Sequence, residues 1–215
     1  MIDARAVRFV IKPLVFIAAL APLGLLAHGA ATGGLGANPI EAITHGTGDW
    51  TLRFLLVTLA LTPLRVLTGW NAFARFRRLL GLFAFFYGCL HLLTYVWLDK
   101  FFSWGDIARD IPRRPFITAG VAAFVVLVPL AATSTAGMIR RLGGRAWKRL
   151  HRLVYLSAMG GVLHYWWLVK ADVSRPRMYA IILAAILAVR LYVAWRQPSR
   201  TTAPSKSRAS TSASR

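Results

Sequence analysis

The chain has 215 residues, of which 57% are hydrophobic and only 16% are charged, whereas an ordinary globular domain is about 45–50% apolar and about 25% charged. The formal charge is +20, but the basic residues lie between long apolar segments, which argues against nucleic-acid binding and is typical of a cytoplasmic membrane face. The single cysteine, Cys89, excludes an internal disulfide, a cysteine-ligated iron–sulfur cluster and a zinc finger.

Six apolar segments are long enough to cross a bilayer, which takes a helix of about 20 residues. In chain order they cover residues 7–27, 50–67, 79–98, 115–133, 147–169 and 178–195. The sequence therefore predicts an all-α, multi-pass membrane protein whose residues 7–196 form a six-helix bundle. Two glycine-rich stretches, residues 32–36 and 46–48, are predicted to be loops, and the polar tail, residues 197–215, is predicted to be disordered and cytoplasmic.

The connecting segments predict the orientation of the bundle. The N-terminal dozen residues, residues 65–78, residues 140–152 and the tail from residue 190 hold 19 basic residues and one acidic residue. The other set, residues 28–53, 99–114 and 170–177, holds 8 basic and six acidic residues. Because Lys and Arg mark the cytoplasmic side, both termini are predicted to be cytoplasmic.

His91 and His164 lie inside the third and fifth predicted spans, where an ionisable residue indicates a functional site. His91 is 12 residues beyond Leu79 and His164 is 14 beyond Leu150, or roughly 18 and 21 Å at 1.5 Å per residue, so the two rings are predicted at nearly equal height. Two imidazoles facing each other at one level suit the two axial positions of a haem iron. Zinc is disfavoured because it needs further ligands, and a neutral imidazole that is hydrogen-bonded across helices is the structural alternative.

His151 opens the fifth span, thirteen residues or about 20 Å before His164. In an ideal helix the two rings face roughly 140° apart unless a kink at residues 160–161 corrects this, and the third-span position level with His151 is Arg78, which cannot ligate iron. Three roles stay open for His151: a haem ligand with an unusual second ligand, a neighbour of a flavin or quinone, and a partner of a backbone carbonyl.

Polar groups at the two ends of the bundle have simpler explanations. His28 and His45 are interpreted as solvated histidines, with contact to a quinone or an external partner as the alternative. The basic residues of the inner face follow from topology alone, although one or two of them could pair with haem propionates or a flavin phosphate. The residues in question are Arg75, Arg77, Arg78, Arg145, Lys148, Arg149 and Arg152.

Short motifs around these histidines resemble MsrQ, a family of haem-binding membrane subunits of the bacterial periplasmic protein–methionine-sulfoxide reductase system. The resemblance covers roughly residues 8–196. Its motifs are Gly34-Leu-Gly-Ala-Asn-Pro39, His45-Gly-Thr-Gly48, Leu61-Thr-Pro63, Arg77-Arg-Leu-Leu-Gly-Leu82, His91-Leu-Leu-Thr-Tyr95, Thr133-Ser134, Leu150-His151, Val154-Tyr155, His164-Tyr-Trp and Val169-Lys170.

The resemblance implies a ferric-reductase-like bundle of six helices in the bacterial inner membrane. It implies b-type haem, one or two per chain, with His91, His151 and His164 as the haem-associated histidines, and it implies FMN, for which no residue is matched. Electrons would come from the quinone pool or a cytosolic flavin reductase and pass to a periplasmic molybdopterin catalytic subunit that reduces methionine sulfoxide in oxidised envelope proteins.

The residues alone lead to a compatible hypothesis, a membrane cytochrome that relays electrons outward and does no bond-breaking chemistry itself. The 20 residues after Trp195 are far fewer than the at least about 50 of an independent domain, so NAD(P)H is not expected to bind through a nucleotide fold of this chain. Two alternatives remain: a quinol-linked cytochrome b that serves another periplasmic acceptor, and a six-span transporter in which His91 and His164 form a proton relay.

Overall fold

The computed structural model describes residue 5 and residues 7–196, so the predicted disordered tail lies outside the described residues. Helices are the only regular elements in this part of the chain. The first half contains η1 (Val7–Ile11), α2 (Lys12–Thr32), α3 (Pro39–Thr68), α4 (Phe73–Leu93), η2 (Thr94–Asp99) and α5 (Trp104–Arg113). The second half contains α6 (Pro115–Ala132), α7 (Ala136–Leu142), α8 (Gly144–Leu150), η3 (His151–Leu153), α9 (Val154–Leu168) and α10 (Ser174–Arg196).

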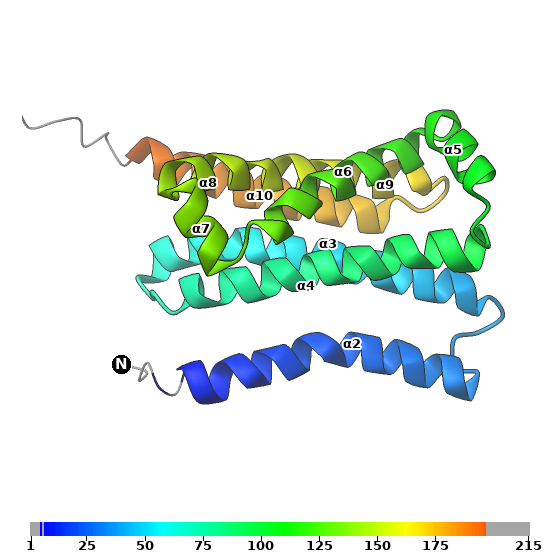
Figure 1. Ribbon diagram of the computed structural model, residues 1–215, viewed down its shortest axis with the longest axis horizontal. Coiled ribbons are helices and arrows are strands. Elements are labelled where there is room, and N and C mark those ends of the chain that lie inside the picture. The colour runs from blue at the N-terminus through cyan, green and yellow to red at the C-terminus, as the bar shows by residue number, and fades with distance from the viewer. Residues whose placement is uncertain (1–4, 6, 197–215) are drawn as a thin grey trace, which may run out of the picture.

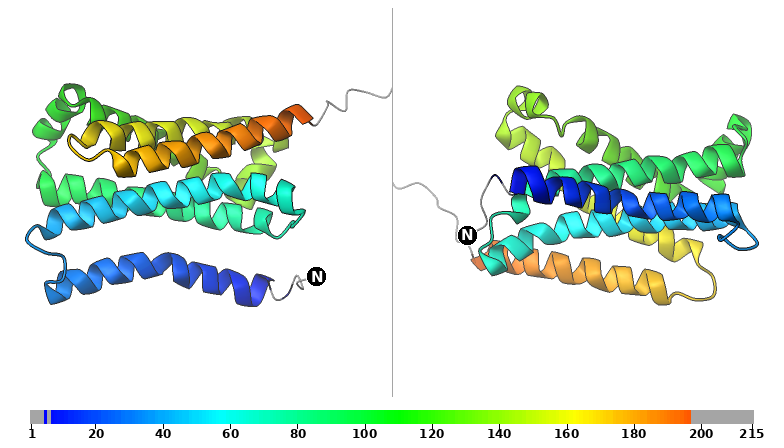
Figure 2. Two further views of the ribbon diagram at one scale, coloured as in Figure 1. Left: turned by 180° about the vertical axis from the view of Figure 1, so that it is seen from behind. Right: turned by 90° about the horizontal axis from the view of Figure 1, so that it is seen from below.

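The long helices lie side by side along one axis (Figure 1). The most extensive contacts join α3 to α4 and α6 to α9, and α10 packs against both α3 and α9. Helix α2 lies on the side of the α3–α4 pair that faces away from α6, α9 and α10 (Figures 1 and 2). Helix α5 caps one end of the bundle, whereas α7, α8, the start of η1 and the end of α10 lie at the opposite end. The end that carries α5 is called the outer end below.

Within the described part of the chain, five helical segments are long and apolar enough to cross a membrane: Phe9–Thr32, Pro39–Thr68, Phe73–Asp99, Pro115–Ala132 and Ser174–Arg196. The continuous helix predicted over residues 147–169 is wrong. The chain there forms α8, a 3-10 turn over His151–Leu153 and then α9, which has only 15 residues and is about 22 Å long. The change of helix type lies at His151, and Gly160 and Gly161 lie within regular α-helix.

Helix α3 begins eleven residues before the predicted span because its N-terminus is well capped. The side chain of Asn38 accepts a hydrogen bond from the backbone N of Glu41 at 3.2 Å, and Pro39 supplies the first helical φ angle. The prediction of a loop at residues 46–48 is consequently wrong, because these residues lie inside α3. The other glycine-rich stretch does end α2, at Gly33, whose φ of 73° favours glycine.

A tyrosine hydroxyl compensates for a helix-interior proline in α2. Pro22 has no backbone N–H to donate. Beside it, the fully buried Tyr87 of α4 donates its hydroxyl hydrogen to the carbonyl of Ala19 at 2.9 Å and accepts from the backbone N of Leu23 at 3.1 Å. The hydroxyl therefore lies between the two ends of a hydrogen bond that a regular helix would make directly, and it fixes α2 to α4.

An arginine compensates for the interior proline of α3. Pro63 cannot donate to the carbonyl four residues earlier, which belongs to Leu59. Arg190 of α10 donates to that oxygen from Nε at 3.1 Å and from Nη2 at 2.8 Å, and its Nη1 also bonds the hydroxyl of Tyr155. Each nitrogen of this charged group, which lies within a predicted span, thus has a hydrogen-bond partner.

Candidate functional site

Each of the two histidines in the predicted spans is oriented by a backbone carbonyl of the helix packed against its own. His91 of α4 donates from Nδ1 to the carbonyl of Thr44 in α3 at 2.9 Å, and His164 of α9 donates from Nδ1 to the carbonyl of Phe116 in α6 at 2.6 Å. Because a carbonyl oxygen only accepts, Nδ1 carries the hydrogen in both rings. A neutral imidazole in this tautomer has its lone pair on Nε2, which is the arrangement found in metal-ligating histidines.

A glycine makes room for each ring. Gly48 lies four residues after Thr44, and Gly120 lies four residues after Phe116. A Cβ atom at Gly48 would stand 3.0 Å from Cε1 of His91, and one at Gly120 would stand 2.7 Å from Nδ1 of His164. The α3–α4 and α6–α9 pairs therefore hold their histidines in the same way, by a carbonyl and by a glycine four residues further on.

The structure brings the two rings together. Their centroids are 5.9 Å apart, and the ring planes make an angle of 77°. An imidazole nitrogen binds a transition metal at about 2 Å, so two nitrogens on opposite sides of one metal stand about 4 Å apart and their ring centroids somewhat further. The observed distance between the two ring centroids is close to that expected for two imidazoles on one metal. It also agrees with the predicted equal height of His91 and His164.

The pair lines a cavity of about 360 Å³ between α3, α4, α6 and α9. Its deep end is mainly apolar and includes Leu55 and Leu127. Polar side chains line the outer end, among them Tyr95, Asp99 and Arg114. A mainly apolar cleft with a few polar groups gathered at one end is the usual form of a site for a bulky organic cofactor.

His151 does not line this cavity. Its ring stacks on Trp147 with the centroids 3.9 Å apart, and its buried Nδ1 has no hydrogen-bond partner among the described residues. The carbonyl-bonded role that the sequence left open is therefore not the one this nitrogen adopts. Of the two remaining histidines, His45 lines the cavity from α3, whereas His28 is exposed and lies outside it.

Some of the inner basic residues line a second, more open groove. Arg75 and Arg78 of α4 and Lys12 of α2 surround it together with apolar side chains, and its volume is about 660 Å³. None of the inner-face arginines named from the sequence lines the cavity of His91 and His164. A contact of these arginines with a flavin phosphate stays a prediction.

The ligand chemistry favours a prosthetic group over a bare ion. Structural and catalytic zinc sites take three or four protein ligands. Among the residues that the structure describes, no group of three or more His, Cys, Asp or Glu side chains is placed to hold a metal ion. Two imidazoles on opposite walls of an apolar cavity can supply both axial ligands of an iron whose other four ligands belong to a porphyrin.

Sequence reasoning did not single out the residues that hold the rings. Thr44 and Phe116 act through their main-chain carbonyls, which leave no mark in the sequence. Gly48 and Gly120 do leave a signal, because a glycine inside an apolar helical segment often marks a close approach of another group.

Comparison with known proteins places the chain in a family. The model of the family described as "Ferric reductase like transmembrane component" matches residues 47–162, which is more than half of the chain. The chain belongs to the ferric-reductase-like transmembrane family. Within it, a relative from Herminiimonas arsenicoxydans is 55% identical over 195 residues, covering 90% of this chain and 89% of that protein. Another from Rhodospirillum rubrum is 56% identical over 191 residues, covering 89% and 92%.

Both relatives are named "Protein-methionine-sulfoxide reductase heme-binding subunit MsrQ". A third protein with this name, from Azospira oryzae, is 52% identical over an alignment that covers 90% of this chain and 85% of that protein. This confirms the resemblance to MsrQ that the sequence motifs indicated. No solved structure matches the chain.

Proposed function

We propose that this protein is the haem b electron-transfer subunit of a protein-methionine-sulfoxide reductase system, with His91 and His164 as the axial ligands of one haem. The observation that carries the proposal is the pair of imidazoles whose ring centroids are 5.9 Å apart. In each ring Nδ1 is hydrogen-bonded to a carbonyl, so Nε2 is available to bind iron. The bound haem supplies one-electron redox capacity, and the chain binds it, orients its ligands and insulates it from water.

The direction of transfer follows from the proposed topology. Both termini lie in the cytoplasm and α9 belongs to the fifth of six spans, so the His91–His164 pair stands in the periplasmic half of a bacterial inner membrane. Electrons enter from quinol or a cytosolic flavin reductase and leave to a periplasmic molybdopterin reductase of methionine sulfoxide. His151, near the inner end, belongs to the entry side as a ligand of a second haem or as a neighbour of FMN or a quinone.

The test uses the purified full-length protein. A low-spin, six-coordinate b-type haem spectrum is expected, together with reduction by a quinol or by a flavin reductase with free flavin. NADH or NADPH alone should reduce it poorly. A colourless preparation that binds no haem on reconstitution would contradict the proposal and favour the transporter with a histidine proton relay.

A further inference from the structure

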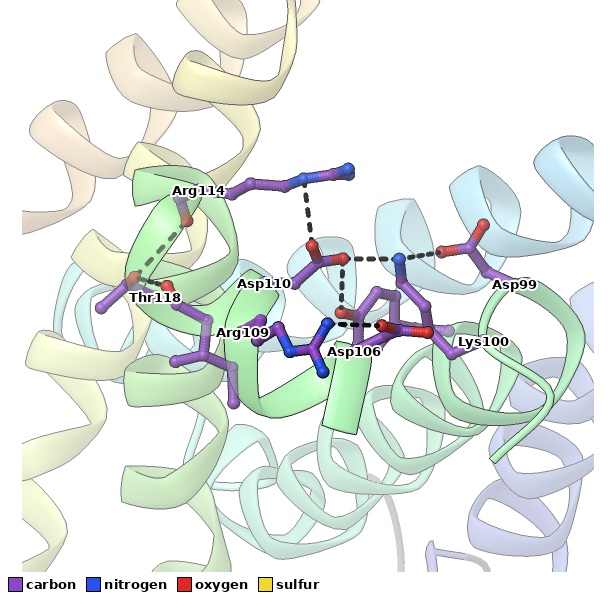
Figure 3. Close-up of polar contacts among 9 residues, drawn as sticks. Asp99, Lys100, Asp106, Arg109, Asp110, Arg114 and Thr118 are labelled. Atoms are coloured by element: carbon purple, nitrogen blue, oxygen red, sulfur yellow. Dashed lines mark hydrogen bonds and ion pairs between the residues drawn. The ribbon is translucent and has the colours of Figure 1, made fainter. Parts of the chain in front are cut away.

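A cluster of charged side chains lies at the outer end of the cavity, around Asp110 of α5 (Figure 3). Lys100 Nζ lies 2.5 Å from Oδ2 of Asp110, and the hydroxyl of Tyr95 donates to the same oxygen at 3.3 Å. Nε of Arg114 lies 3.5 Å from Oδ1. Asp110 therefore fixes the position of a cation, Arg114, that also lines the cavity.

Arg114 is close to the ligand pair and has donors to spare. It lies at the junction of α5 and α6, two residues before Phe116, whose carbonyl accepts the hydrogen bond from His164. A guanidinium has five N–H donors. Among the described residues, its only acidic partner within salt-bridge distance is Asp110, through Nε. Its side chain is 51% exposed, so it stands where the cavity meets the outer surface.

The charges at this end leave room for one more anion. Asp49, which also lines the cavity, lies 3.7 Å from both Arg53 and Arg175. In the two ion-pair clusters that contribute residues to the cavity lining, four cations contact three carboxylates, which leaves a net charge of +1. The cations are Arg53, Lys100, Arg114 and Arg175, and the carboxylates are Asp49, Asp99 and Asp110.

We propose that Arg114 binds a propionate carboxylate of the haem held by His91 and His164, and that Asp110 is its positioning residue. The inference rests on the proposed function. Haem carries two carboxylates that are too costly to leave charged in hydrocarbon, so they must turn toward the polar end of the cavity. The planar fork of an arginine matches a carboxylate, and Arg114 is the arginine that lines this cavity.

The experiment compares porphyrins with and without the carboxylate charges. Detergent-purified, haem-depleted full-length protein is titrated with haem b and with haem dimethyl ester, and the reduction potential of each product is measured. Wild-type protein should prefer haem b. Arg114→Gln should bind haem b about three- to tenfold more weakly, in line with a half-exposed charge-assisted contact, and bind the ester as wild type does. Its potential with haem b should fall, because a cation near the iron favours the reduced state.

Arg109→Gln is the matched control. Arg109 lies on α5, 3.8 Å from Asp106, and does not line the cavity, so its variant should behave as wild type (Figure 3). The inference is overturned if Arg114→Gln keeps both the wild-type preference for haem b and the wild-type potential. If Arg114→Gln does not insert, Arg114→Lys, which keeps the charge but not the fork, must show a reduced preference. If wild type gives no low-spin spectrum with either porphyrin, the proposed function fails, and this inference with it.

Discussion

Gly120 and His164 are so close that a Cβ atom on the glycine would stand 2.7 Å from Nδ1 of the imidazole. The same nitrogen bonds the carbonyl of Phe116, one turn earlier on α6. The ring therefore fits between a carbonyl and a bare Cα, and its orientation depends on the absence of a side chain at position 120.

Gly120→Ala should displace the imidazole of His164. Overpacking of this kind costs about 1–3 kcal/mol, and here the strain falls on the proposed ligand, so low-spin haem should decrease. The measurement is haem content and spin state in inserted protein. Gly24→Ala in α2 is the control, because a Cβ atom at Gly24 would meet nothing within 4 Å. Equal low-spin haem in the two variants would show that the glycine is not required.

Replacing the three histidines in turn should separate their roles. His91→Ala and His164→Ala each remove one side of the pair and should abolish the low-spin, six-coordinate spectrum, although some haem can remain in the apolar cavity. His151 lies outside that cavity, so His151→Ala should leave the low-spin signal of the pair and impair only reduction from the cytoplasmic side. The assignment is wrong if His151→Ala removes all low-spin haem while His91→Ala leaves it unchanged.

The sequence predicted those features that depend on composition and spacing. Hydrophobic length indicated the helical class and five segments that the structure also finds long and apolar enough to span, and residue counting placed His91 and His164 at one level. The break at His151–Leu153 could not be predicted, because no proline or glycine marks it. The carbonyls of Thr44 and Phe116 were equally invisible, since every residue carries one.

Removing Arg190 should destabilise the bundle through the carbonyl of Leu59. Arg190→Leu leaves that oxygen without its donor, at a cost of about 1–3 kcal/mol. Pro63→Ala restores an N–H four residues after Leu59, so the cost of Arg190→Leu should be smaller in the Pro63→Ala background. Thermal unfolding of the four proteins in one detergent measures this coupling. Strictly additive effects would mean that Arg190 does not act by satisfying this carbonyl.

Acidification should loosen α5. The hydrogen bond from Lys100, supported by the charge of Arg114, holds the pKa of Asp110 below its ordinary value. The folded pKa lies below the unfolded value of about 3.9. The stabilisation of the fold by the ionised Asp110 carboxylate is therefore complete above that value, and it is lost as the pH falls through the folded pKa. Wild type should therefore lose thermal stability relative to Asp110→Asn below about pH 4. Parallel pH profiles of the two proteins would contradict this.

The proposed orientation predicts the side on which each end of the bundle lies. A reporter that is active only in the periplasm should be silent when fused after Gln197 and active when inserted near Asp106, as expected from the 19 basic residues on one side and the 8 on the other. The reverse pattern would refute both the orientation and the outward direction of electron transfer.

The repeated carbonyl–histidine–glycine arrangement has a consequence for how the protein is made. The α3–α4 pair, with His91, leaves the ribosome 73 residues before His164 of the α6–α9 pair is complete. A haem that meets the nascent chain at that stage finds one oriented imidazole and one wall of its cavity. Six-coordinate binding is therefore possible only after α9 has inserted. Under the proposed function, haem binding through both histidines is a late step of biogenesis, because it requires the α6–α9 pair to have formed.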